Sequence, residues 1–277
     1  MSISQGDMAI LVNTSDGFAD CWDPFFELWR TYAADIKDLP IYLNTERIGY
    51  HTNGLDVRTT HVWPKDESPR PTWSTCLDRG LAQITEEKVL YLQEDYFLTQ
   101  PLRADCITRA SALLDAHPQF DAVYLNNYGP KFEDGQPIAE SFVAVPRLSK
   151  YLLSTQAALW KRDALRSHIQ GWENGWMFEK FGTWRAARAS RQFASVAPKI
   201  MHEQPVIDYI YTGVMKGKWH RACPALFNAH GIDVDFSHRG FYRSSGPLKT
   251  KFEVVWKLAS DPRLALQSAR SVWTAKQ

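Results

Sequence analysis

The sequence predicts an α/β fold in which a mostly parallel, twisted sheet carries helices on both faces. Short apolar, β-branched segments alternate with helical segments from the first residues onward, and several of the apolar segments end in polar residues. Such alternation is typical of successive strand–helix–strand units. Because ligands bind beyond the carboxyl ends of strands in these sheets, the polar residues that end the strands are the first candidates for a site.

The alternation is clearest in the first half of the chain. Strands are predicted over residues 9–14, 39–44, 59–63, 88–92 and 121–125, and helices over 16–33, 75–85 and 103–117. After a turn-rich loop, residues 143–151 are predicted to be extended, and residues 153–160 lead into a helix over 161–171. We therefore expect one domain over residues 1–242, with halves at about 1–128 and 129–242.

Residues 243–277 form a basic C-terminal extension. This segment holds seven basic residues against two acidic ones, a net charge of +5, interleaved with tryptophan and leucine. Such a composition suits an amphipathic helix at an anionic membrane surface, and it also suits an aromatic helix packed on the main domain. Pro262 interrupts any single long helix.

Charge and cysteine usage limit the functional classes. The chain carries 32 basic and 31 acidic residues, so it lacks an overall basic footprint and we expect no nucleic-acid partner. Its four cysteines are far apart and form no CxxC pair, as expected for reduced cytosolic thiols. The sequence shows no secretory signal and no apolar run of about 18–20 residues. We therefore predict a cytoplasmic protein, with membrane contact only at the inner face of the cytoplasmic membrane.

The most informative segment is VLYLQEDYFL, residues 89–98. An apolar strand here delivers Glu94 and Asp95 to its end, where buried carboxylates are costly unless they have a partner. One suitable partner is a divalent cation, since Mn²⁺ and Mg²⁺ prefer oxygen ligands and bridge diphosphates. The alternative is a solvated strand end paired with an arginine.

This segment and the strand–helix–strand pattern before it resemble glycosyltransferases of the GT-A fold, in particular bacterial enzymes of O-antigen and capsule synthesis. In that family an acidic motif, often DxD, closes a central strand and holds the metal ion and the donor diphosphate. This chain reads Gln93-Glu94-Asp95, so only Asp95 matches the last acid and dependence on Mn²⁺ or Mg²⁺ is left open. The resemblance covers residues 8–240 in layout.

The resemblance implies a Rossmann-like half, about residues 1–128, that binds a nucleotide-sugar donor. The strand-end residues Asn13, Thr14 and Glu46 would hold the base and ribose, and the carboxylates of Glu94 and Asp95 would face the diphosphate or its metal. Lys218, in GVMKGKWHRA (213–222), would contact the diphosphate. His202, from the last third of the chain, would be a further metal ligand.

The second half, about residues 129–242, would bind the acceptor. By the resemblance, LSTQAALWKRDAL (153–165) supplies Gln156 and Trp160 to an acceptor pocket, although Trp160 equally suits a core position. The acceptor hydroxyl needs a general base, and the segment ENGWMFEKFGTWRAAR (173–188) offers two. Glu179 is preferred because it would share a helix face with Trp176 at i, i+3, and Glu173 is second. A surface glutamate paired with an arginine is the alternative.

The resemblance thus implies an inverting glycosyltransferase of surface polysaccharide synthesis, such as lipopolysaccharide or capsule. It would move a sugar from a nucleotide-diphosphate donor to a glycan or lipid-linked acceptor. A sugar nucleotidyltransferase is disfavoured because NTSDGFADCW (13–22), after the first strand, holds one glycine and no basic residue. A non-catalytic carbohydrate-binding protein is disfavoured because such modules are usually β-sandwiches.

Overall fold

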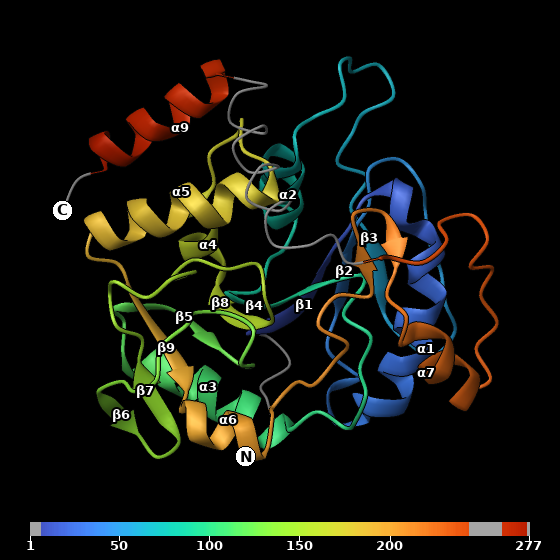
Figure 1. Ribbon diagram of the computed structural model, residues 1–277, viewed down its shortest axis with the longest axis horizontal. Helices are drawn as coiled ribbons and strands as arrows, with labels where there is room; N and C mark the ends of the chain where they lie inside the picture. Colours follow the sequence, from blue (N-terminus) through green and yellow to red (C-terminus); the bar gives the residue numbers. More distant parts are fainter. Residues whose placement is uncertain (1–6, 244–261, 276–277) are drawn as a thin grey trace.

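The computed structural model describes residues 7–243 and 262–275, and its main feature is a nine-stranded sheet between two layers of helices (Figure 1). The strands are β1 (Met8–Asn13), β2 (Ile41–Asn44), β3 (Val57–Thr59), β4 (Lys88–Gln93), β5 (Phe120–Tyr124), β6 (Pro137–Ala139), β7 (Phe142–Ala144), β8 (Ala158–Lys161) and β9 (Gln192–Val196). A separate hairpin joins β10 (Val214–Met215) to β11 (Lys218–Trp219). The α-helices are α1 (Trp22–Tyr32), α2 (Trp73–Leu81), α3 (Ala104–Ala116), α4 (Arg162–His168), α5 (Gly175–Arg188), α6 (Pro198–Glu203), α7 (Cys223–Ala229) and α9 (Pro262–Thr274), and two 3₁₀ helices are η1 (Asp16–Cys21) and η2 (Ala34–Ile36).

The strand order is β3-β2-β1-β4-β8-β5-β9-β7-β6. Strands β3, β2, β1 and β4 are parallel neighbours, as are β5 and β9. Within this sheet only β8 and β7 run against the others, β8 lying between β4 and β5. The predicted α/β class with a mostly parallel sheet is therefore confirmed.

The helices expected over 75–85 and 161–171 are the shorter α2 and α4, and three other elements differ from the structure in kind or position. The strand expected over 59–63 is β3, which pairs with β2 at Val57–Thr59. The helix expected over 16–33 begins as the 3₁₀ helix η1, in which Phe18 has non-helical backbone angles, and the Asp16 carboxylate accepts hydrogen bonds from the backbone N–H groups of residues 46–48. The extended segment expected over 143–151 ends at Ala144, since a turn follows in which the Ser149 N–H donates to the carbonyl of Pro146.

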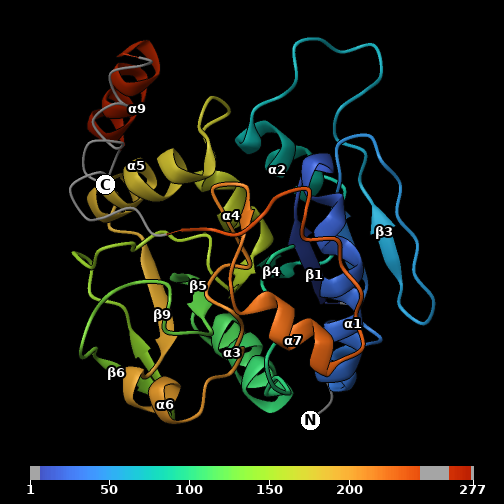
Figure 2. The same cartoon turned by 45° about the vertical axis from the view of Figure 1, so that its right-hand side comes forward.

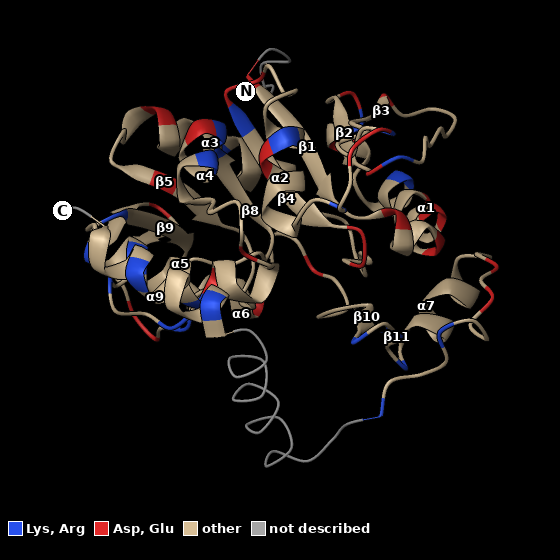
Figure 3. Ribbon diagram, turned by 90° about the horizontal axis from the view of Figure 1, so that it is seen from above, with Lys and Arg blue, Asp and Glu red and all other residues tan. Residues whose placement is uncertain are grey.

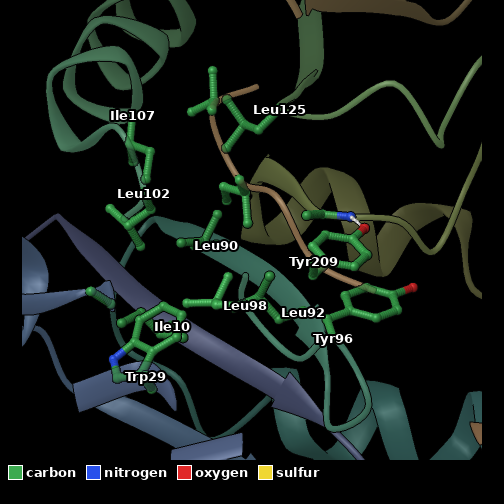
Figure 4. Packing of buried hydrophobic residues seen from close by; sticks show 14 of the residues in the cluster. Ile10, Trp29, Leu90, Leu92, Tyr96, Leu98, Leu102, Ile107, Leu125 and Tyr209 are labelled. Atoms are coloured by element: carbon green, nitrogen blue, oxygen red, sulfur yellow. Dashed lines mark hydrogen bonds between the residues drawn. The ribbon is translucent and has the colours of Figure 1, made fainter. Parts of the chain in front are cut away.

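The alternation of side chains along the strands builds two cores. Figure 4 shows Ile10 of β1 and Leu90 of β4 on the face covered by Trp29 of α1 and Ile107 of α3. The intervening residues, such as Leu11 and Tyr91, point to the opposite face, which α2, α4 and α5 cover (Figure 2). Because both faces are buried, the strands are nearly continuous apolar runs.

Trp160 of β8 belongs to the second of these cores. It is 1% exposed. Its ring makes edge contacts with the rings of Tyr124 and Phe193, whose centroids lie 6.3 and 5.8 Å away. A ring buried on all sides offers no face to a sugar. The expected acceptor-binding role of Trp160 is therefore wrong, and the core alternative holds.

The described part of the C-terminal extension is α9, which lies along α5 (Figures 1 and 3). Trp172 Nε1 donates to Oγ of the fully buried Ser268 at 3.2 Å, and Arg185 donates to Ser271 Oγ at 3.0 Å. This part of the extension thus packs on the main domain, while residues 244–261 lie outside the described residues. Membrane contact remains a prediction, and among the described residues no helix has the length and apolarity to cross a bilayer.

Candidate functional site

The polar ends of β1 and β2 form one hydrogen-bonded group. Asn44 Nδ2 donates to Asn13 Oδ1 at 2.9 Å, and Asn13 Nδ2 donates to the hydroxyl of Tyr91 at 3.2 Å. Helix α2 comes so close that a Cβ on Gly80 would lie 2.2 Å from Asn44 Oδ1, so only glycine fits there. The strand-end amides are therefore packed tightly against the C-terminal turn of α2.

A pocket of about 200 Å³ opens at these strand ends. Its walls include three of the residues predicted to bind the nucleotide, namely Asn13, Thr14 and Glu46. Glu46 is buried, and its Oε1 accepts hydrogen bonds from Nε and Nη2 of Arg70, both at 2.6 Å. The three predicted residues meet because parallel strands end at the same edge of a sheet.

Arg70 and Trp73 also line this pocket, and the sequence did not indicate either. Arg70 belongs to the long connection between β3 and α2, and Trp73 is the first residue of α2, so the placement of both depends on the course of that connection. Arg79 of α2 binds the carbonyl of Val62 and the carboxylate of Glu67 in that connection. No local pattern in this connection identifies which of its residues face the strand ends.

Glu94 and Asp95 follow β4 at the same edge, and both are buried. Loss of hydration raises the pKa of Asp95, and hydrogen bonds from Thr212 and Val214 partly offset that rise. Burial also raises the pKa of Glu94 well above its ordinary value, and the charge of Asp95 adds to the rise. A buried carboxyl with a strongly raised pKa at the ligand edge of a sheet is typical of functional sites.

The Asp95 carboxylate anchors the β10–β11 hairpin. Its Oδ2 accepts hydrogen bonds from Thr212 Oγ1 at 2.6 Å and from the Val214 N–H at 3.1 Å. The Asp95 carbonyl accepts a further bond from the Gly213 N–H at 2.9 Å. Asp95 Oδ2 thus faces a packed segment of chain, whereas the resemblance implies that this carboxylate faces the donor diphosphate or its metal ion.

The described residues do not form a complete set of protein ligands for Mn²⁺ or Mg²⁺. Asp95 Oδ2 already accepts hydrogen bonds from Thr212 and Val214, and Glu94 is buried beside Asp95. His202 is an exposed residue of α6, which packs beside β9, and in the described residues no three His, Cys, Asp or Glu side chains are grouped to hold a metal ion. The structure therefore does not bring Asp95 and His202 together as a pair of metal ligands.

Glu179 lies in the second turn of α5, whose N-terminus is capped by the Asn174 side chain. Its Oε1 accepts three hydrogen bonds, from Thr155 N at 2.8 Å, Thr155 Oγ1 at 2.9 Å and Ser154 Oγ at 3.2 Å. Oε2 accepts none from the described part of the chain. One carboxylate oxygen is thus fixed in place, and the other remains for a ligand.

A second group of contacts joins Glu179 to the end of β4. Tyr96 donates from its hydroxyl to the carbonyl of Thr155 at 3.0 Å, and its ring stacks on Tyr209 with centroids 4.3 Å apart. Tyr209 in turn donates to Gln156 Oε1 at 2.8 Å. Burial raises the pKa of Tyr91, and the charges of Glu94 and Glu179 add to the rise, so both carboxylates lie near this one phenol.

Glu173, the second predicted base, lies inside the protein. It is 0% exposed, and its two oxygens bind Arg185 at 2.6 and 2.7 Å. A carboxylate closed off by a bidentate arginine cannot reach a substrate, so this assignment is wrong and the predicted alternative, a Glu–Arg pair, applies in buried form. Trp176 is partly exposed beside Glu179, and Lys218 is exposed on β11 with its Nζ 3.4 Å from the carbonyl of Arg239.

No protein-family model and no curated protein sequence matches this chain. Among solved structures, residues 1–349 of S. aureus TarS share 13% identity with a TM-score of 0.46, over 69% of this chain and 58% of that one. Full S. aureus TarS gives 14% identity and a TM-score of 0.47, over 84% of this chain and 41% of that one. A mycobacterial protein gives 11% identity and a TM-score of 0.42, over 82% of this chain and 76% of that one.

One TarS structure is a complex with UDP and another a complex with UDP-GlcNAc. This chain spans 58% and 41% of the two TarS chains compared above. At these identities and TM-scores the likeness concerns the fold, and the function has to be argued from the site.

Replacing Asp95 tests its anchoring contacts. Asp95→Ala leaves the Thr212 hydroxyl and the Val214 N–H without their acceptor, and we expect it to lower the free energy of unfolding by about 1–3 kcal/mol in a urea titration. Asp95→Asn keeps an acceptor oxygen at the same place and should cost less. Equal stability of Asp95→Ala and the parent chain would contradict this role.

Replacing Glu94 tests its burial. Because its pKa is raised by folding, the folded chain retains a proton that the unfolded chain loses above the ordinary value of 4.5, so stability falls as the pH rises through that range. Glu94→Gln removes this penalty, and we expect a higher melting temperature than the parent at pH 8 and little difference at pH 4. A melting temperature that is lowered at pH 8 would show that the ionised carboxylate is stabilised in the fold.

Proposed function

We propose that this chain is a glycosyltransferase that uses a nucleotide-sugar donor. The observation that supports it is the convergence on one sheet edge of a polar pocket (Asn13, Thr14, Glu46), a buried acid pair (Glu94, Asp95) and a separately held carboxylate (Glu179). The polar pocket would bind the nucleoside of the donor, and the Glu179 carboxylate would activate the acceptor. The tyrosines at the end of β4 join the two sides.

The first half of the chain would bind the donor. Asn13 and Glu46 supply fixed donors and acceptors for a base and ribose, and Trp73 supplies an aromatic wall. Arg70 on this pocket and Lys218 on the β10–β11 hairpin would offset the charge of the diphosphate. Asp95 would act by holding that hairpin at the strand end.

Glu179 would act as the general base. Its Oε1 is held by Ser154 and Thr155, so Oε2 would accept the proton of the acceptor hydroxyl. The acceptor oxygen would form a bond to the anomeric carbon as the bond from that carbon to the diphosphate oxygen breaks. The diphosphate leaves with the electron pair, and attack from the opposite side inverts the anomeric centre.

The acceptor class is part of the proposal. A glycan or lipid-linked acceptor in surface polysaccharide synthesis fits a site whose second half is rich in aromatic residues. The nucleotidyltransferase alternative remains less suitable, because η1 follows β1 with Asp16, whose carboxylate binds the backbone N–H groups of residues 46–48. That turn presents an acid where such enzymes hold a basic phosphate loop.

A thermal-shift panel of nucleotides and nucleotide sugars, each with manganese or with EDTA, tests donor binding. A ligand that binds only the folded chain raises its stability by about 2.7 kcal/mol at 100 times its Kd. We expect at least one UDP-, GDP- or dTDP-sugar to raise the melting temperature, and the comparison of manganese with EDTA shows whether binding needs a divalent cation. Absence of stabilisation by any nucleotide or nucleotide sugar in either condition would overturn the function.

Glu179→Gln tests the base once a donor is found. The amide keeps the shape of the side chain and loses its basicity, so we expect kcat to fall by about 10²–10⁴-fold with the nucleotide-induced thermal shift retained. Glu203→Gln, an exposed change on α6, is the matched control and should leave kcat unchanged. A variant of Glu179 with nearly full kcat would remove this residue from the mechanism.

A further inference from the structure

A second pocket, of about 310 Å³, opens directly beside Glu179. Its walls include Trp176, Lys180 and Trp184 of α5, together with Lys150 and Tyr151 from the segment before β8. The volume lies near the lower limit of about 300 Å³ for small-molecule sites. It is therefore suited to one compact ligand group next to the proposed base.

Aromatic rings are exposed around this pocket. Tyr151 is 50% exposed, Trp184 47% and Tyr211 52%. Burial raises the pKa of Tyr211, and the nearby charge of Glu179 and the phenol of Tyr151 add to it, so the third ring lies close to the same carboxylate. A group of exposed aromatic rings marks an interaction site, and their flat faces suit the apolar face of a sugar ring.

Tyr151 is held at the pocket by an unusual backbone conformation. Its φ angle is +57°, in the left-handed region that bulky residues rarely adopt. Such conformations cost on the order of 1–3 kcal/mol and are concentrated at ligand-binding segments. The preceding residue, Lys150, is fixed by a hydrogen bond from the Lys131 N–H to its carbonyl at 2.9 Å, and among the described residues no aromatic ring stacks on Tyr151.

Two ammonium groups complete the pocket. Lys150 and Lys180 are both exposed, and neither forms an ion pair with an acid in the described residues. Lys180 Nζ lies 5.1 Å from the centroid of the Trp184 ring. The one carboxylate of the pocket, Glu179, takes its hydrogen bonds from Ser154 and Thr155. Positive charge therefore exceeds negative charge by one at this aromatic site.

We infer that the acceptor sugar bound here is anionic and carries a carboxylate or a phosphate group. Its ring would lie among Tyr151, Trp176 and Trp184, and its charged substituent would bind Lys150 and Lys180. This places an acceptor hydroxyl toward Glu179 Oε2. The inference rests on the proposed glycosyltransferase function and specifies its acceptor class. The aromatic rings alone would also suit a neutral hexose, and the two lysines are what favours a charged one.

Three glycosides that share one ring test this inference. Methyl glucoside, methyl glucuronide and methyl glucoside 6-phosphate differ only at C6, and saturation-transfer NMR on the full chain measures their binding. We expect one or both charged glycosides to bind at least about tenfold more tightly than the neutral one, equivalent to about 1.4 kcal/mol. The charged glycoside that binds identifies carboxylate or phosphate as the preferred group.

Lysine variants locate the effect. Lys150→Ala and Lys180→Ala change exposed residues and should each reduce the preference for the charged glycoside, and the double variant should abolish it. Lys37→Ala, an exposed lysine in another part of the chain, is the matched control and should retain it. Trp184→Ala should weaken binding of every glycoside that binds.

Three outcomes overturn the inference: equal binding of neutral and charged glycosides, no binding of any, or a charge preference that survives in the double lysine variant. The nucleotide thermal-shift panel, run on the same preparation, separates this from a failure of the proposed function. Donor stabilisation without a charged-glycoside preference leaves a glycosyltransferase with a neutral acceptor. Absence of donor stabilisation rejects the function itself.

Discussion

The buried carboxylate of Asp95 is the contact on which the placement of the β10–β11 hairpin depends. It binds Thr212 and Val214, and it can do so only because residue 213 is glycine, where a Cβ would lie 2.2 Å from Phe97 and 2.8 Å from the Asp95 carbonyl oxygen. The central strand thereby holds the β10–β11 hairpin. Through Trp219 and Phe227, the packing extends to α7. Burial of the Asp95 carboxylate without partners would be costly, and its hydrogen bonds to Thr212 and Val214 offset that cost while they join β4 to a distant segment of the chain.

The same strand end also positions the opposite side of the site. Tyr96, the residue after Asp95, binds the carbonyl of Thr155, while the backbone and hydroxyl of Thr155 hold Glu179. A shift of the β4 end would therefore move both the hairpin and the proposed base. The Glu173–Arg185 pair supports α5 from inside, beside α9, so two glutamates six residues apart have unrelated surroundings.

Much of the donor side follows from local pattern, because strand periodicity and parallel pairing together place strand-end residues at one edge. Asn13, Thr14 and Glu46 were predicted to lie together on this ground, and the structure places them in one pocket. The assignments of Glu173 and Trp160 failed for a common reason. A sequence pattern predicts the element on which a residue lies, but it does not identify the group that the side chain meets across the fold.

The sequence by itself determined the α/β class and the mostly parallel sheet, because these depend on the spacing of apolar residues within each segment. Only the tertiary structure decided that Asp95 meets a hydroxyl 117 positions away, that Glu179 and not Glu173 faces outward, and that Lys150 lines a pocket with Lys180. These pairings join segments that are distant in the chain. Their formation depends on how whole layers pack on the sheet, which no local spacing encodes.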